Sequence, residues 1–185
     1  MLDQISELVK QFGGDAIVNN QSVPNEHNDA VMNETSSSIL SGLKDMVAGG
    51  NINDIAGLLN SGSVDSSNPV VQKLTEQLSG NLGQKFGLSS DAASGVAGNM
   101  IPKVLGSLIG KAQDPNQPGF NVSDIVNSIG GGNSGGLMDA VSKYGGQFGL
   151  DQNNDGKVDM SDATAAISGK SGGFLSGILG KIFGK

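Results

Sequence analysis

The side chains best suited to chemistry gather in one short segment, residues 151–162, which read DQNNDGKVDMSD. Residues able to offer an oxygen ligand recur at alternate positions. Carboxylate and amide oxygens are the ligands that hard divalent cations prefer. The segment therefore predicts a metal site, and its predicted ligands are Asp151, Asn153, Asp155, Lys157, Asp159 and Asp162.

The spacing of these residues is that of an EF-hand calcium loop, whose ligands occupy positions 1, 3, 5, 7, 9 and 12 around a glycine at position 6. Gly156 falls at the sixth position and the apolar Val158 at the eighth. Lys157 would contribute its backbone carbonyl, and Asp159 would act through a bridging water. A generic polar turn is also rich in Asp, Asn and Gly, but it has no reason to keep this alternation. We expect Ca²⁺ to be the bound ion.

The twelfth position departs from the usual bidentate glutamate, because Asp162 is one methylene shorter. This predicts weaker calcium binding and competition from Mg²⁺, which binds through fewer protein ligands. The loop resembles those of dockerin modules and other bacterial EF-hand-like repeats, where Asp at this position is common. Dockerins carry two such repeats, whereas the segment 114–125 has Pro118 at its fifth position and Ile125 at its twelfth. The resemblance therefore implies no cohesin partner.

Composition excludes several function classes. The 185 residues make one ordinary domain, or a domain with an appendage, and contain no cysteine, so disulfides, thiolate metal sites and cysteine catalysis are excluded. The net charge is −7, and the basic residues are eleven lysines without any arginine. Readers of phosphates and base edges rely on the planar fork of arginine, so we expect no nucleic-acid partner.

Nothing in the sequence favours an enzyme. The only histidine, His27, stands in a polar stretch beside Glu26 and Asp29, which predicts a solvated residue rather than a general base. Paired carboxylates occur only in the calcium loop, and no phosphate-binding glycine motif follows a strand. We expect a non-enzymatic protein.

Two features of the sequence bear on the location of the protein. No segment reaches the roughly 18 consecutive apolar residues of a membrane span. The amino-terminal MLDQISELVKQF has no basic region and no cleavage site. These features predict a cytoplasmic protein. Non-classical export is the alternative, because it would leave no signal sequence at the amino terminus.

Apolar residues recur at helical spacing and predict an all-α fold. We expect helices over residues 2–12, from about 29 to 48, over 52–59, over 69–86 and from about 91 to 110, with residues 15–28 as a loop. Asn53 or Asp54 is the expected cap of the third helix, and Asn68 with Pro69 opens the fourth. The last of these helices is the predicted core helix, kinked at Pro102 and with ten inward residues: Ala92, Ala93, Val96, Ala97, Met100, Ile101, Val104, Leu105, Leu108 and Ile109.

Two parts of this region resemble a known family. The stretch Leu82–Leu88 (LGQKFGL), the Ser/Asp/Ala turn after it, and Met100–Leu105 (MIPKVL) resemble the core of the bacterial YidB-like domain family. The resemblance extends over roughly residues 1–130. It implies a multihelical fold of unknown function and no active site.

A glycine-rich joint over residues 130–136 separates the predicted domain 1–129 from a carboxy-terminal unit, 137–185. Ser123 is expected to cap a short helix before this joint. The unit would comprise a helix over 137–148, the calcium loop, a short exit helix over 161–167, and an amphipathic helix over 174–183 carrying Lys181. Gly145 and Gly146 weaken the entering helix, so we expect Ca²⁺ to order the unit.

Three functional hypotheses follow. The first is a non-enzymatic calcium-binding structural or interaction protein. The second is a membrane- or assembly-binding protein that acts through residues 174–183, which resemble a peripheral membrane helix and whose alternative role is to pack on the rest of the protein. The third is a homodimer, because EF-hands usually work in pairs and two loops would then pair in trans.

Overall fold

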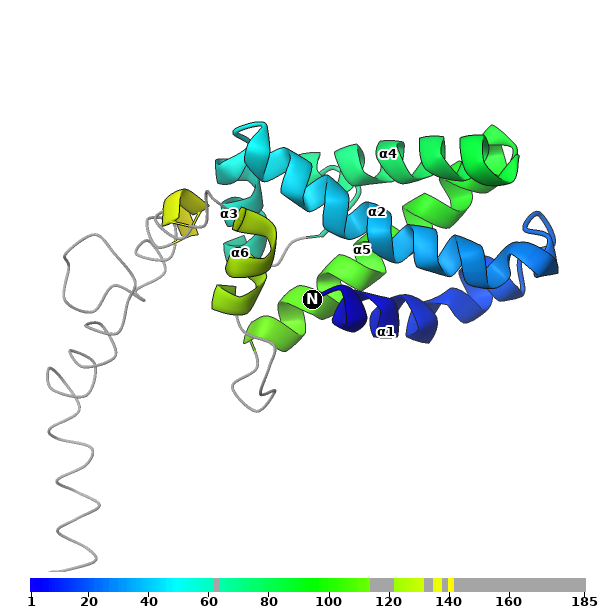
Figure 1. The fold of residues 1–185 in the computed structure, drawn as a ribbon, viewed down its shortest axis with the longest axis horizontal. Coiled ribbons are helices and arrows are strands. Elements are labelled where there is room, and N and C mark those ends of the chain that lie inside the picture. The colour runs from blue at the N-terminus through cyan, green and yellow to red at the C-terminus, as the bar shows by residue number, and fades with distance from the viewer. Residues whose placement is uncertain (62–63, 114–121, 132–134, 138–139, 142–185) are drawn as a thin grey trace, which may run out of the picture. The chain divides into compact units, whose positions relative to one another are not determined.

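The computed structural model describes residues 1–61, 64–113, 122–131, 135–137 and 140–141 (Figure 1). The chain divides into two units, Met1–Leu137 and Met138–Lys185. Only residues 140 and 141 of the second unit are described, so the helices named in the next paragraphs all belong to the first unit. Throughout the described ranges the regular elements are helices and there is no strand, which confirms the predicted all-α class for this part of the chain.

The elements follow one another with short connections. They are α1 (Leu2–Gly13), the π-helical turn η1 (Gly14–Val18), the 3₁₀ turn η2 (Asn25–His27), α2 (Asn28–Ala48), α3 (Ile52–Ser61), α4 (Pro69–Phe86), α5 (Ser90–Gln113) and α6 (Val122–Gly130). In Figure 1, α2 runs between α1 and α4, and α5 crosses behind them. Helix α2 contacts each of the other five α-helices, and α5 contacts α1, α4 and α6.

The core lies where these helices face one another. All ten inward residues predicted for the fifth helix are buried, which confirms its place in the core. Helix α2 contributes Val31, Ile39, Leu43, Met46 and Val47, and α4 contributes Val70, Val71, Leu74, Leu78 and Leu82. Long runs of apolar residues at helical spacing leave little choice about which face turns inward.

Local sequence signals set both ends of α4. The N–H of Val70 donates to Oδ1 of Asn68 at 2.9 Å, and Pro69 occupies the first helical position, where its missing N–H costs nothing. The helix ends at Gly87, whose φ of +66° is left-handed and whose N–H donates to the carbonyl of Gly83 at 3.0 Å. The predicted amino-terminal cap is confirmed.

The predicted loop over residues 15–28 is wrong in part. Gly14 keeps a right-handed helical conformation, and the chain widens into η1, where the N–H of Asn19 donates to the carbonyl of Gly14 at 2.8 Å. This wider turn brings Ala16 and Ile17 into the core, and Val23 is also buried. Conversely, Leu2 is 44% exposed, so the buried stripe of α1 begins at Ile5.

Several predicted details of helix starts and contacts are also wrong. Helix α3 begins at Ile52, so Asn53 and Asp54 lie within its first turn instead of capping it. Helix α6 begins at Val122, which places Ser123 inside the helix. The small residue Gly98 could let a neighbouring helix approach α5, but it is exposed with open space around it. Helix α5 continues across Pro102 to Gln113, and the kink predicted at Pro102 stays a prediction.

Most of the predicted carboxy-terminal unit lies outside the described residues. Of the predicted helix over 137–148, only Leu137, Ala140 and Val141 are described, all three in helix, and Leu137 is buried in the first unit. The predicted joint over 130–136 and the domain boundary drawn through it stay predictions. No helix in the described part is long and apolar enough to cross a membrane.

Candidate functional site

The predicted metal ligands, Asp151 to Asp162, all lie outside the described residues. The same holds for the exit helix over 161–167 and for the amphipathic segment 174–183. Within the ranges that the structure does describe, no group of three or more His, Asp or Glu side chains is placed to hold a metal ion. The calcium site therefore stays a prediction from the sequence.

His27 is half-buried rather than fully solvated. It closes η2, and its ring centroid lies 5.8 Å from that of Phe86, with the two planes inclined by 47°. Because Phe86 is the last residue of α4, this contact joins the start of α2 to the end of α4. The ring contact gives His27 a packing role.

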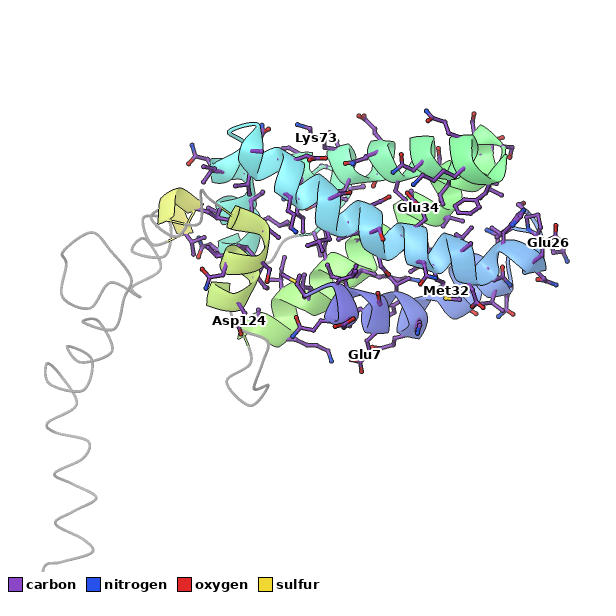
Figure 2. All side chains as sticks on the ribbon, in the orientation of Figure 1. Glu7, Glu26, Met32, Glu34, Lys73 and Asp124 are labelled. Carbon is purple, nitrogen blue, oxygen red and sulfur yellow. The ribbon has the colours of Figure 1, made fainter. Side chains whose placement is uncertain are left out.

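The principal polar cluster of the described part joins α2 to α4. The ammonium Nζ of Lys85 donates to Oε2 of Glu34 at 2.7 Å, the hydroxyl of Ser38 donates to Oε1 of Glu34 at 3.1 Å, and Nδ2 of Asn81 donates to Oγ of Ser38 at 2.9 Å. Figure 2 marks Glu34 on the side of α2 that faces α4. We call these four residues the α2–α4 relay.

The relay is built to hold two helices in register. The Glu34 side chain is 13% exposed and Ser38 is buried, whereas the Lys85 side chain is 55% exposed. Both carboxylate oxygens of Glu34 accept a hydrogen bond, and the Ser38 hydroxyl both donates and accepts. A buried polar group whose hydrogen bonds are satisfied costs little free energy and restricts how the elements around it can be oriented. The relay therefore fixes how α2 packs on α4.

Sequence reasoning missed the relay. Its signal was two pairs at helical spacing of four, Glu34 with Ser38 and Asn81 with Lys85. Such pairs occur on many solvated helix faces. They gain meaning only once α2 and α4 are known to pack together.

Two open hollows on the surface lie between α4 and α5. Their volumes are about 430 Å³ and 400 Å³. Their α4 residues recur at helical spacing from Val71 to Gln84, which places both hollows on one face of the helix. We call the two together the α4–α5 groove; its α4 lining is Val71, Gln72, Thr75, Glu76, Ser79, Gly80, Gly83 and Gln84, and its α5 lining is Ser90, Ala93, Ser94, Gly98 and Pro102.

Comparison of the chain with protein-family models, with curated proteins and with solved structures finds no match. The resemblances to the YidB-like family and to EF-hand-like loops therefore depend on the residues quoted for them in the sequence.

Proposed function

We propose that this protein is a non-enzymatic calcium-binding structural or interaction protein in which Ca²⁺ orders the carboxy-terminal unit. The observation that carries the proposal is the spacing of oxygen ligands from Asp151 to Asp162 around Gly156. The helical unit would act as the scaffold. Its resemblance to the YidB-like family is part of the proposal.

The donor set fits a hard divalent cation. It holds four carboxylates, one amide and one backbone carbonyl within twelve residues, so a single local loop supplies the ligands without ordering distant parts of the chain. Four aspartates and Lys157 give the loop a net charge of −3. These like charges repel one another in the absence of metal, and a divalent ion relieves most of that repulsion.

The coupling to folding follows from the residues around the loop. Gly145 and Gly146 stand just before it, and each glycine disfavours a helix interior by about 1 kcal/mol relative to alanine. The metal would bind a loop that lies between two predicted helices, so its binding free energy would be coupled to the ordering of these helices. We expect calcium to raise the helical content of the full-length protein.

Terbium luminescence tests the site directly. Tyr144 is the only tyrosine and there is no tryptophan, so sensitised emission reports an ion bound near the loop. We expect emission that Ca²⁺ displaces and that Asp155→Ala abolishes, whereas the matched variant Asp45→Ala, on the exposed face of α2, keeps it. Emission that persists undiminished in Asp155→Ala would place the ion elsewhere.

The twelfth ligand gives a second, independent readout. A glutamate can coordinate with both oxygens at this position. Asp162→Glu is therefore expected to tighten Ca²⁺ binding and to weaken competition by Mg²⁺ in the same titration. An unchanged ratio of Ca²⁺ to Mg²⁺ affinity would show that residue 162 is not a ligand.

The alternative function is binding to a membrane or an assembly through residues 174–183. The observation that favours it is the row of six apolar residues at helical spacing in a segment whose charged residue is Lys181, followed by Lys185. Co-sedimentation with anionic vesicles tests it, comparing the full-length chain with a chain that ends at Ser171. The alternative requires that binding be lost on truncation.

The third possibility, pairing of two loops in a homodimer, has its own test. Sedimentation of the full-length protein with and without Ca²⁺ measures the oligomeric state. A monomer under both conditions eliminates it.

A further inference from the structure

One methionine of the described helices is open to solvent. Of the three methionines in these helices, Met46 and Met100 are 2% and 0% exposed, whereas Met32 in α2 is only half-buried. Figure 2 marks Met32 on the side of α2 that faces α1. A methionine thioether is oxidised by peroxides where the oxidant can reach the sulfur atom. We therefore expect a dissolved oxidant to reach Met32 before the other two.

The thioether of Met32 fills a space that a glycine leaves open. A Cβ built on Gly13, the buried last residue of α1, would lie 3.2 Å from Sδ of Met32 and 3.4 Å from its Cγ. A Cβ built on the neighbouring Gly14 would meet nothing within 4 Å. The two adjacent glycines are therefore not equivalent. At Gly13 the lack of a side chain lets the thioether pack directly against the backbone.

This contact lies where α1 passes into the π-helical turn η1. Cδ1 of Ile17, a residue of η1 that is 0% exposed, lies 3.7 Å from the same Cβ position of Gly13. The turn contacts α1, α2 and α5. Turns of this kind are rare and frequently mark functional sites. The thioether of Met32 thus belongs to the packing that holds η1 in the core.

We propose that Met32 is a site of reversible oxidation that loosens η1. A peroxide transfers one oxygen atom to Sδ: the O–O bond breaks, an S–O bond forms, the sulfur loses two electrons, and the peroxide leaves as water or an alcohol. Methionine sulfoxide is polar and chiral, and it disrupts apolar packing. Because its oxygen needs a hydrogen-bond donor, the side chain turns from Gly13 toward water and the packing around Ile17 is lost. Sulfoxide reductases reverse the modification.

The first test asks which methionine peroxide attacks. The full-length protein is treated with hydrogen peroxide, and peptide mass spectrometry follows each methionine separately over time. We expect Met32 to gain one oxygen at least tenfold faster than Met46, the matched control in the same helix, and than Met100 in α5. Equal rates at the three positions, or no oxidation of Met32 in the folded protein, would overturn the proposal.

Amide hydrogen exchange measures the consequence at η1. The N–H of Asn19 donates to the carbonyl of Gly14 at 2.8 Å and closes this turn, whereas the N–H of Asn51 donates to the carbonyl of Met46 at 2.9 Å at the other end of α2. Oxidation is expected to speed exchange at Asn19 at least fivefold and to leave exchange at Asn51 unchanged. An equal change at both amides would indicate general unfolding, and no change at Asn19 would show that η1 does not depend on the thioether. Either result refutes the proposal.

Replacing the thioether separates Met32 from the other methionines of the chain. Met32→Leu keeps an apolar side chain of similar volume and leaves Met1, Met138 and Met160 in place. In urea denaturation, peroxide is expected to lower the midpoint of the wild-type protein, a sulfoxide reductase to restore it, and the midpoint of Met32→Leu to stay unchanged under the same treatment. The same fall in the variant would assign the effect to another methionine and overturn the proposal. None of these readouts involves a metal, so they are independent of the calcium proposal.

Discussion

Gly42 is the position where a single methyl group best tests how α2 meets α4. A Cβ built there lies 2.3 Å from Cδ2 of Leu74 and 2.6 Å from Oε1 of Gln77, both well inside van der Waals contact. Leu74 is buried, so it can move only by disturbing its own neighbours. Gln77 is half-buried on the same face of α4 and can move toward solvent.

The size of the effect follows from two opposing terms. Alanine gains about 0.5–1 kcal/mol over glycine in a helix interior. Forcing an extra methyl group into a packed interface costs about 1–3 kcal/mol. For Gly42→Ala we therefore expect a net loss of about 1 kcal/mol in the free energy of unfolding.

A matched variant isolates the packing term. Gly95 lies in α5 with nothing within 4 Å of its Cβ position, so Gly95→Ala receives the helix gain alone. Urea denaturation followed by far-ultraviolet circular dichroism should place Gly42→Ala about 1.5–2 kcal/mol below Gly95→Ala. Equal stability of the two variants would refute the close approach of α2 and α4 at this point.

Three further substitutions are expected to have graded effects in the same urea experiment. Ser38→Ala removes the hydroxyl that joins Asn81 to Glu34, and we expect a loss of about 1–3 kcal/mol because two buried or half-buried groups lose a partner. Asn68→Ala removes the cap of α4 and should cost about 1 kcal/mol, with Asn68→Asp as the variant that retains stability. Lys85→Met breaks an ion pair whose lysine is largely exposed, so the loss should stay below about 1 kcal/mol and should vanish in 1 M salt; a larger loss that persists in salt would contradict this reasoning.

Sequence reasoning predicted the elements whose signals are local. The start of α4 at Asn68 and Pro69 follows from hydrogen bonds within one turn. The ten inward residues of α5 follow from the repeat of the helix itself. It was wrong after Gly14, because two adjacent glycines usually end a helix and in this chain the backbone continues in a wider turn. Small size alone does not say which side of α5 meets a neighbour, and Gly98 is exposed.

The chain by itself determined its helical class, the inward faces of its long helices, and the ligand spacing of residues 151–162, since each of these depends on contacts within a few turns or one loop. The tertiary structure decided which polar residues became internal and which glycines were required. Ser38 is buried because α4 brings Asn81 against it, and Gly42 is needed because Leu74 lies opposite. Both depend on the pairing of helices more than thirty residues apart in sequence, and helical periodicity carries no information about that pairing.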